Sequence, residues 1–363
     1  MNKISFIITS FSSGGAEHQL KELSNNLVES GFDVEIATFA DLPDHYELDK
    51  RIIRKRIAPN KNNIIKLGAL WLYIFSNKSK KIFCFGQRES LLTLIPILFL
   101  RKIFFVGERN TNLGKLSFLQ HLKLNFLYKR ANYIIPNSYT QGEMIKSNFP
   151  RHASKIHIIT NFTDINKYVN RGYAKHDVLN ICIFARYSEQ KNYRRFASAL
   201  KEIKKLSKKT FHVDWFGNIK YKNTDLNPHY IEFNELIKLY DIEDIISLHD
   251  SITDVSTRMN EYDAFCLPSI YEGFSNSISE AISCGLPVIA SNVSDNYVMV
   301  KDGINGFLFN PLDIDDIKTC LLKFVNLPFE KRKTMARESR RIAENLFDKK
   351  TFIDKYLEIL SQN

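Results

Sequence analysis

The chain has 363 residues, which suits two domains of ordinary size, and its hydrophobic content of 44% is typical of a globular protein rather than a disordered one. The net charge of +11 arises in residues 1–170, where 24 Lys and Arg accompany 13 Asp and Glu, whereas residues 171–363 have 27 of each. A basic first half favours phosphate, nucleic acid or an anionic membrane as partner, or serves solubility alone.

Strand-length apolar runs alternate with helix-length segments from the first residues onward. A strand over 3–9 precedes a helix over 16–30, in which Leu20, Leu23 and Leu27 share one face. Further strands are predicted at 33–38, 81–85, 101–106, 132–136 and 155–159. Such alternation predicts a parallel sheet with helices on both faces.

Two apolar segments of the first half raise the question of a membrane. Residues 91–106 are interrupted by Pro96 and by the pair Arg101 and Lys102, so they predict a buried helix and strand rather than a span of about 20 residues. Residues 62–79 combine Leu, Ile, Trp and Phe with flanking lysines. This composition predicts either a helix on a membrane surface or a core helix whose lysines reach the solvent.

A polar, aperiodic stretch then interrupts the pattern before a second alternating series begins. Its strands are predicted at 178–184, 211–216, 245–248, 263–267 and 287–290, and its final helices at 313–325, 329–345 and 350–361. We therefore predict two doubly wound domains joined by a linker at 166–177. Residues 1–165 form the domain on the acceptor side, and residues 178–345 form the nucleotide-sugar domain. A last helix at 346–363 is expected to pack back on the first domain. Ligands of such sheets bind at the carboxyl ends of strands, which places the expected site in a cleft between the domains.

The compartment is suggested by the cysteines and the first residues. Five cysteines are widely spaced without a CxxC pair, so we expect buried thiols of a cytoplasmic protein rather than zinc ligands or disulfides. The short strand-like stretch that follows Met1 lacks a cleavage site, which is not typical of a signal peptide.

The first candidate site is the loop between the first strand and the first helix, where Gly14 and Gly15 stand together. Two glycines let the backbone approach a ligand closely, and the helix N-terminus behind them favours an anion. The spacing is not GxGxxG, so a tight turn without a ligand explains these glycines equally well.

The second candidate site is the segment 184–192, which also lies between a strand and a helix. Lys191, Arg194 and Arg195 gather at the start of that helix, where cations oppose the helix dipole. A bound diphosphate would reverse this penalty, with Arg186 donating to two phosphate oxygens and Lys191 acting as a point charge. The alternative is a solvated basic turn.

The third candidate site, residues 268–290, reads PSIYEGFSNSISEAISCGLPVIA. Glu272 lies in a loop after a strand, and Glu280 lies near the start of the next helix, so both carboxylates are expected at the carboxyl edge of the sheet. A carboxylate can accept hydrogen bonds from two sugar hydroxyls. For Glu280 an alternative is a capping box with Ser277. The residues expected to contact the nucleotide beside these glutamates are Phe274, Ser275, Asn276 and Ser277.

In this order, the motifs resemble the large fourth family of retaining glycosyltransferases with the GT-B fold. The resemblance covers nearly the whole chain and rests mainly on the E-x7-E block of 272–280, together with the Gly-Gly loop, the Arg-x4-Lys segment of 186–191 and the Gly-rich turn at 303–308. It implies two Rossmann-like domains facing across a cleft. It also implies that Glu272 contacts the donor sugar, that Glu280 holds the ribose, and that Arg186 and Lys191 bind the diphosphate.

The segment that follows the fourth predicted strand adds a detail to this resemblance. Glu108, Arg109 and Asn110 resemble the Glu-Arg-Asn segment of family members that build surface polysaccharides from N-acetylhexosamine donors. We therefore expect Arg109 to act beside the reacting sugar, and Glu108 and Asn110 to contact the acceptor; an internal ion pair is the alternative. One departure is Asp250, where many members have glycine.

The sequence thus predicts transfer of a hexose or N-acetylhexosamine from a nucleoside diphosphate sugar to a lipid-linked saccharide at the inner membrane face. The resemblance favours UDP as the nucleotide. No cofactor or metal is expected, because Asp313 and Asp315 follow Pro311 at a helix start, where acidic residues act as caps. A nucleotide-sugar epimerase is the first alternative. A nucleic-acid-binding protein is the second, although no zinc spacing or RNA motif supports it.

Overall fold

The computed structural model describes residues 3–12, 14–109, 116–170, 172–207, 209–221 and 225–362. They form two compact units. Unit 1 comprises Met1–Phe162 and Lys349–Asn363, and unit 2 comprises Thr163–Asp348. The last helix of the chain therefore belongs to the first unit, and the chain passes from one unit to the other at the start of the polar stretch expected to be a linker.

Unit 1 is built on a six-stranded parallel sheet in the order β3-β2-β1-β4-β5-β6. Its strands are β1 (Lys3–Ile8), β2 (Asp33–Thr38), β3 (Ile53–Arg56), β4 (Lys81–Cys84), β5 (Ile103–Glu108) and β6 (Tyr133–Pro136). Its helices are α1 (Gly15–Glu29), α2 (Asn63–Ser76), α3 (Gln87–Leu98), α4 (Phe118–Arg130), α5 (Tyr139–Asn148) and α13 (Lys349–Ser361). This is the strand order of the dinucleotide-binding fold.

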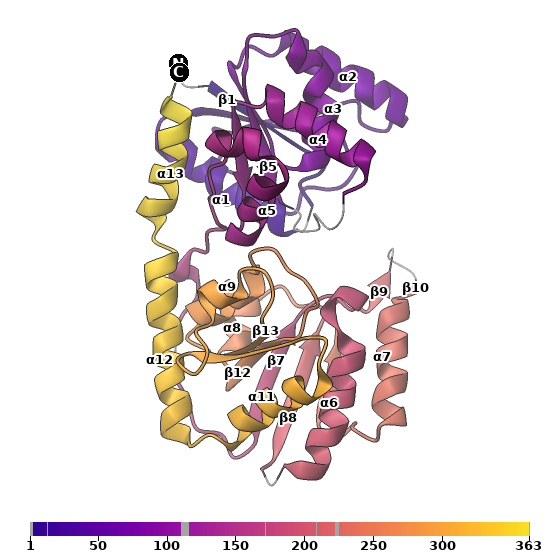
Figure 1. The fold of residues 1–363 in the computed structure, drawn as a ribbon, viewed down its shortest axis with the longest axis vertical. Coiled ribbons are helices and arrows are strands. Elements are labelled where there is room, and N and C mark those ends of the chain that lie inside the picture. Colours follow the sequence, from indigo (N-terminus) through magenta and orange to yellow (C-terminus); the bar gives the residue numbers. More distant parts are fainter. Residues whose placement is uncertain are drawn as a thin grey trace. The chain divides into compact units, whose positions relative to one another are not determined.

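The two faces of this sheet carry separate apolar cores. On one face, Leu20, Leu23 and Leu27 of α1 are fully buried with Phe352 and Tyr356 of α13, as the helical spacing of the leucines predicts. On the other face, α2, α3 and α4 lie in a row (Figure 1) and bury their inner side chains together with those of α5. The sheet is therefore covered on both sides, as expected for parallel strands.

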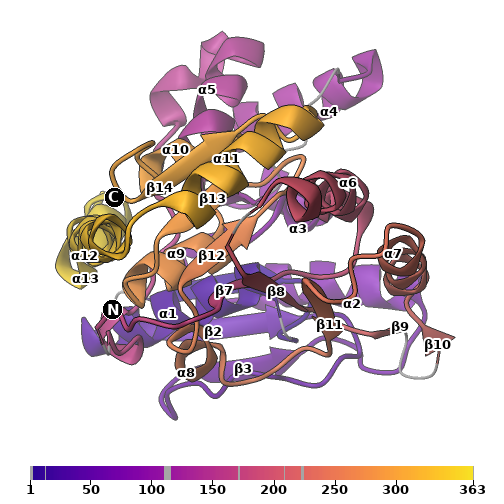
Figure 2. The same cartoon turned by 90° about the horizontal axis from the view of Figure 1, so that it is seen from below.

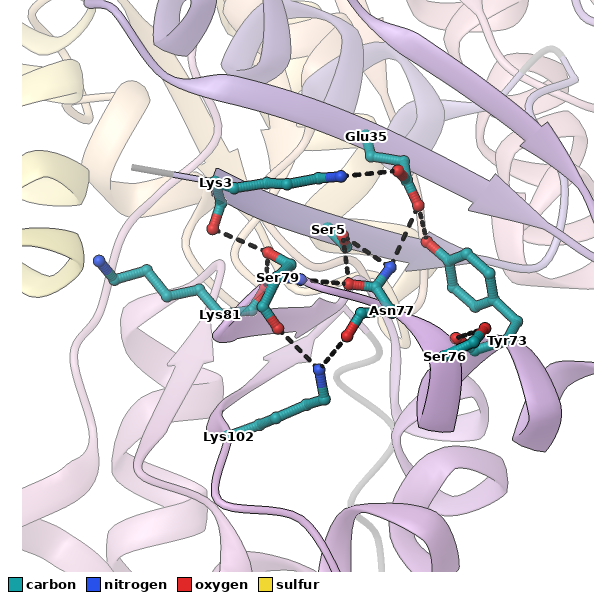
Figure 3. Close-up of polar contacts among 9 residues, drawn as sticks. All are labelled: Lys3, Ser5, Glu35, Tyr73, Ser76, Asn77, Ser79, Lys81 and Lys102. Atoms are coloured by element: carbon teal, nitrogen blue, oxygen red, sulfur yellow. Dashed lines mark hydrogen bonds and ion pairs between the residues drawn. The ribbon is translucent and has the colours of Figure 1, made fainter. Parts of the chain in front are cut away.

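A polar network fixes the end of α2 to the amino-terminal edge of the sheet (Figure 3). The buried carboxylate of Glu35 accepts hydrogen bonds from Tyr73 of α2 and from Asn77 at 3.1 Å, and it pairs with Lys3 at 3.3 Å. Lys102 donates to the carbonyl oxygens of Asn77 and Ser79 at 2.6 and 2.8 Å. These contacts hold the C-terminal end of α2 to the edge of the sheet.

Unit 2 repeats the strand order of unit 1, since its parallel sheet runs β11-β8-β7-β12-β13-β14 (Figure 2). Its strands are β7 (Leu179–Phe184), β8 (Phe211–Phe216), β11 (Ile246–His249), β12 (Ala264–Leu267), β13 (Val288–Ser291) and β14 (Gly306–Phe309), with a short hairpin of β9 (Lys220–Tyr221) and β10 (Asp225–Leu226). Its helices are α6 (Tyr193–Leu206), α7 (Pro228–Leu239), α8 (Val255–Met259), α9 (Asn276–Ser283), α10 (Asn296–Met299), α11 (Ile314–Asn326) and α12 (Phe329–Leu346). The predicted fold class of two doubly wound parallel sheets is confirmed.

Three segments differ from the sequence prediction. The strand expected at 155–159 is a single bridge between Ile156 and Ile134, because a 3-10 helix over Pro150–Lys155 occupies the preceding residues. The strand β3 was not predicted, since its IRKR sequence is largely exposed at the sheet edge. The strand β14 begins within the expected turn, and Gly306 is needed there because a Cβ would lie 1.7 Å from the carbonyl oxygen of Val288.

Candidate active site

Two loops of unit 2 meet because the strands before them are neighbours. β7 pairs with β12, so the segments that follow these strands emerge side by side at the carboxyl edge of the sheet. The N–H of Ile270 donates to the carbonyl of Gln190 at 2.8 Å, and the Gln190 side chain donates to the carbonyl of Tyr271 at 2.9 Å. The second and third candidate sites of the sequence are thus joined by one backbone hydrogen bond and by one from a side chain to a backbone carbonyl.

An ion pair between Lys191 and Glu272 completes this junction. The Nζ atom of Lys191 lies 2.5 Å from Oε1 of Glu272, and both residues are only 9% exposed. Lys191 ends a 3-10 turn (Glu189–Lys191), and Asn192 follows in the left-handed conformation, with its amide donating to the carbonyl of Pro311 at 2.7 Å. The structure therefore brings together two of the predicted site residues that are 81 positions apart.

Arg186 lies beside this junction and lines a hollow of about 730 Å³ in unit 2. Its side chain is exposed, and Gln190 and Tyr271, the residues that join the two loops, line the same hollow. The remaining described lining residues come mainly from the ends of β7 and β8 and from the start of α7 and include Ser188, Asn218, Lys220, Asn227 and His229. A cavity of this size, with several polar groups and an arginine, suits a small charged ligand.

Large buried side chains hold the loop after β7 in place. Tyr187 reaches the carbonyl oxygens of Trp215 and His249 at 2.8 Å, and the Trp215 indole donates to the carbonyl of Ala185 at 2.9 Å. Gly217 permits this close packing, because a Cβ there would lie 2.4 Å from the Ala185 oxygen. Arg186 therefore projects from a rigid segment.

The cations at the start of α6 have different partners. Arg194 forms a bidentate ion pair with Glu232 and lies over the ring of Tyr193 at 5.0 Å. This contact with Arg194 and a hydrogen bond from Tyr193 lower the pKa of Glu232 to about 2. Arg195 donates to the Asn192 side chain at 3.2 Å. Glu232, which the sequence gave no reason to single out, therefore explains why Arg194 is tolerated there without a phosphate.

The helix α9 begins at Asn276, with Ser275 as its N-cap, whose Oγ accepts from the N–H of Ile278 at 3.4 Å. The capping box considered for Ser277 and Glu280 is therefore wrong. Glu280 is half-buried, and the burial of its carboxyl group raises its pKa to about 7, while a hydrogen bond from Tyr168 acts in the opposite direction. Its carboxylate is thus available for a role other than capping.

The other residues predicted around the nucleotide differ in which of their groups a ligand can reach. The ring of Phe274 is buried against Phe347 with centroids 6.2 Å apart, so Phe274 can contact a ligand only through its backbone. Ser277 is half-buried, and its Oγ lies 3.2 Å from that of Ser275. Asn276 is half-buried at the first position of the helix, where amide groups have no intrahelical acceptor. Ser294, which the sequence did not single out, donates to the carbonyl of Glu272 at 2.5 Å and thereby holds the loop.

In unit 1, the Gly-Gly loop leads directly into α1. Gly14 is the N-cap and Gly15 the first helical residue, and a Cβ on Gly14 would lie 2.3 Å from the Glu17 carboxylate. The glycine thus makes room for Glu17, whose carboxylate also accepts from Ser10 at 3.2 Å. This loop belongs to unit 1.

Arg109 and Glu108, which end β5, have separate environments. Arg109 is half-buried, lies over the Phe85 ring at 4.1 Å and donates to the Tyr356 hydroxyl of α13 at 3.5 Å. Glu108 is fully buried, accepting from Tyr128 at 2.9 Å and from Gln87 at 3.3 Å, and burial raises its pKa to about 7. The expectation that Glu108 contacts an acceptor is corrected, because its carboxylate has no exposed surface. Asn110 lies outside the described residues.

Local contacts bear on several weaker sequence hypotheses. Asp313 is the N-cap of α11, accepting from the N–H groups of Asp315 and Asp316, and the described residues contain no cluster of His, Cys, Asp or Glu that could hold a metal. All five cysteines are free and buried, as predicted. Asp250 accepts from the N–H groups of Ile219 and Ser251, so it closes the loop after β8. Every helix in the described parts of the chain is too short or too polar to cross a bilayer.

Comparison with known proteins defines the class. Over 99% of this chain, the structure resembles sucrose-phosphate synthase from Thermosynechococcus elongatus, with a TM-score of 0.83, 15% identity and 98% of that chain covered. HepE from Anabaena, solved with UDP and glucose, gives a TM-score of 0.80 at 18% identity, with 99% of both chains covered. The fold is thus GT-B, as predicted.

The family follows from sequence models that match consecutive parts of the chain. The model described as Glycosyltransferase Family 4 matches residues 13–167, and the one described as Glycosyl transferases group 1 matches residues 166–342. The chain therefore belongs to the family 4 type of glycosyltransferases. A curated relative from Escherichia coli, UDP-Gal:alpha-D-GlcNAc-diphosphoundecaprenol alpha-1,3-galactosyltransferase, is 29% identical over 187 residues. That match covers 47% of this chain and 45% of the relative, which is less than half of its length.

Proposed function

We propose that this protein transfers a hexose or N-acetylhexosamine from a UDP-sugar to a hydroxyl of a saccharide carried on a polyprenyl diphosphate, with retention of configuration and without a metal, during surface polysaccharide synthesis. The printed activity of the Escherichia coli relative, which names UDP-Gal and a diphosphoundecaprenol-linked sugar, supports this choice of donor and acceptor. The UDP and glucose named for HepE support the donor class.

The observation that carries the proposal is the junction of Lys191 and Glu272 beside Arg186. An ammonium group has three N–H donors and a carboxylate about four acceptor sites, so each can serve more than one partner. We infer that Lys191 also donates to a phosphate and that Glu272 also accepts from sugar hydroxyls. Arg186 adds a planar guanidinium that can donate to two phosphate oxygens.

These groups act on the charge that develops when the donor breaks. The bond between the anomeric carbon and the diphosphate breaks, the acceptor oxygen bonds to that carbon on the same face, and the acceptor proton passes to the departing phosphate. Arg186, Lys191 and the first amide groups of α9 would stabilise the negative charge of the leaving UDP. Such preorganised donors typically contribute several kcal/mol to catalysis.

Substitution of Arg186 tests this assignment. We expect Arg186→Ala to lower kcat/KM by a factor of about 100 or more, because one donor to a developing charge is removed. The matched control is Arg194→Ala, a neighbouring arginine whose charge is already paired with Glu232. Transfer is measured with radiolabelled UDP-sugars and a lipid-diphosphate saccharide. Equal loss of activity in both variants would contradict the assignment.

Three measurements address the remaining choices in the proposal. Incubation of the donor without an acceptor separates transfer from epimerisation, because an epimerase converts the donor alone. We expect full transfer in the presence of EDTA, since two cations take the role of a metal in this account. Analysis of the product linkage by NMR establishes whether the anomeric configuration is retained.

The outer face of three unit 1 helices supports a peripheral membrane contact at the inner face of the membrane. Large apolar side chains on α2, α3 and α4 are exposed, among them Ile64, Leu72, Phe75, Phe99, Phe118, Leu119 and Phe126. Exposed cations accompany them on or between these helices, namely Lys78, Arg88, Arg101, Lys123 and Lys129. Apolar residues beside cations are the combination that anionic lipid surfaces attract.

Vesicle flotation tests the membrane contact. We expect the protein to float with vesicles of anionic lipid and to remain unbound with neutral lipid, because both charge and apolar burial contribute. The double variant Phe118→Ser, Leu119→Ser should lose most of this binding. Leu239→Ser in unit 2, where Leu239 is 74% exposed, is the matched control. Equal flotation with both kinds of vesicle would contradict the proposal.

A further inference from the structure

Two adjoining hollows lie at the carboxyl edge of the unit 1 sheet. One of about 570 Å³ lies between α2 and α3, and the other, of about 660 Å³, lies between α1, α3 and the end of β5. Thr9, Arg88 and Leu92 line both, so the hollows share one wall. Both volumes fall within the range of about 300–1,000 Å³ that is usual for small-molecule sites.

The first hollow is mainly apolar and opens outward along α2. Leu67 and Leu70 of α2 and Leu92 of α3 line it, and its only described acidic lining residue, Asp41, is bound to Lys66 at 2.6 Å. At its mouth, Ile64 is 83% exposed. Exposed apolar surface of this kind is unfavourable in water and is covered well by a flexible hydrocarbon chain.

The second hollow differs from the first in carrying charged groups of both signs beside its apolar lining. Glu17, Glu89 and Arg109 line it, with Glu89 fixed by the N–H of Thr9 at 3.0 Å. Carboxylates accept hydrogen bonds from sugar hydroxyls, and an arginine donates to oxygen atoms of a sugar or a phosphate. A saccharide therefore fits the chemistry of this hollow, in contrast to the hydrocarbon that suits its neighbour.

Arg88 lies on the wall between the two hollows. It is exposed, and the described residues provide it with no ion-pair partner, whereas Lys66 beside it is paired with Asp41. A guanidinium group at the boundary between this apolar hollow and the hollow with charged groups of both signs can donate to two phosphate oxygens at once. The order along the protein surface is therefore hydrocarbon, phosphate, saccharide.

We propose that the two hollows form one site for an isoprenyl diphosphate sugar, with the first isoprene units against Leu67 and Leu92, the diphosphate at Arg88, and the saccharide beside Arg109 and Glu17. The saccharide part of the site rests on the proposed function, because a saccharide is needed there only if the protein transfers a sugar to it. The binding of an isoprenyl diphosphate does not depend on it. Such a site would hold the acceptor by its isoprenyl diphosphate, which stays the same when the saccharide varies.

Calorimetric titration of the full chain with farnesyl diphosphate tests this site directly. We expect the diphosphate to bind more tightly than farnesol or inorganic diphosphate, since each of these occupies one part of the site. Leu67→Trp, which fills the apolar hollow, and Arg88→Gln, which removes the guanidinium, should each weaken binding at least about tenfold, or 1.4 kcal/mol. The matched controls are Leu239→Trp and Arg151→Gln, which change exposed residues outside both hollows and outside the proposed membrane surface, and which should bind as the unsubstituted protein does.

Titration with UDP in the same samples separates this inference from the proposed function. UDP binding that Leu67→Trp leaves intact shows that the variant is folded. If UDP binds but farnesyl diphosphate binds equally to the unsubstituted protein and to Leu67→Trp, the site is refuted and the donor proposal stands. If farnesyl diphosphate binds as expected and UDP does not bind, the donor proposal fails and the lipid site stands.

Discussion

The two units share one strand order but differ at the edge where ligands are expected. In unit 2, the loops after β7 and β12 are joined by hydrogen bonds and by the ion pair of Lys191 and Glu272. In unit 1, the same edge has two open hollows, and Arg88 has no acidic partner among the described residues. At this edge, an ion pair and hydrogen bonds therefore tie two loops of unit 2 together beside the hollow that Arg186 lines, whereas in unit 1 an exposed arginine lies between two hollows.

Each unit also contains a glutamate whose pKa is raised to about 7 by burial. Glu108 of unit 1 is fully enclosed and accepts from Tyr128 and Gln87. Glu280 of unit 2 is half-buried and accepts from Tyr168. The first therefore influences stability alone, while the second is placed to influence a ligand as well.

The largest expected effect concerns the ion pair that distinguishes unit 2. Lys191→Met and Glu272→Gln should each lower the free energy of unfolding of that unit by about 3–5 kcal/mol, because each leaves a buried charge without its partner. Urea unfolding followed by tryptophan fluorescence measures this in a Trp71→Phe background, where Trp215 of unit 2 is the remaining tryptophan.

The double variant provides the control for this effect. Its loss should be clearly smaller than the sum of the two single losses, because no unpaired charge remains. Arg109→Met in unit 1 should cost less than about 2 kcal/mol, since it removes a contact with an aromatic ring rather than an ion pair. If the double variant lost as much free energy of unfolding as the two single variants together, the ion pair would not set unit 2 apart from unit 1.

A smaller effect is expected from Glu108 when pH is varied. Its folded-state pKa lies above the ordinary value, so between pH 4.5 and 7 the folded chain binds a proton that the unfolded chain has lost. Stability of unit 1 should therefore fall as pH rises through this window, by up to about 3 kcal/mol from this group. Glu108→Gln should flatten the dependence in thermal unfolding measured from pH 4.5 to 8. An unchanged slope would contradict the assigned environment.

The smallest effect concerns Glu280 and the donor. Its carboxylate should be charged above pH 7 and protonated below it, so UDP affinity is expected to fall by a few-fold to about tenfold as pH drops from 8 to 6, since hydrogen bonds to charged groups are stronger. Glu280→Gln should bind UDP more weakly at pH 8 and show less change with pH. Calorimetry at both pH values distinguishes this from a purely structural role, which would leave the pH dependence intact.

The periodicity of the sequence predicted most of the fold. Helices such as α1 and α12 and strands such as β2 and β8 were expected almost to the residue, because their apolar spacing matches one period. The edge strand β3 was missed because its Arg and Lys side chains reach the solvent and leave no alternating pattern. Residues 155–159 were wrongly predicted to be a strand, because they are largely apolar and yet add only a single bridge to the sheet.

The candidate site was predictable in its residue types but not in its contacts. Arg186, Lys191 and Glu272 stand out as charged residues after strands. The ion pair of Lys191 and Glu272, however, depends on β12 lying next to β7, which no local sequence pattern reveals. Glu108 shows the limit most clearly. As the last residue of β5 it could point to either face, and only the positions of Tyr128 and Gln87 decide that it is buried.

The central claim is that Lys191 and Arg186 bind the diphosphate of a UDP-sugar in unit 2. Calorimetric titration of the unsubstituted protein and of Lys191→Ala with UDP and with uridine tests it most directly. The account predicts that the unsubstituted protein binds UDP much more tightly than uridine, and that the substitution removes most of this difference while leaving uridine binding unchanged. Equal affinity of both proteins for UDP, with the fold intact, would contradict it.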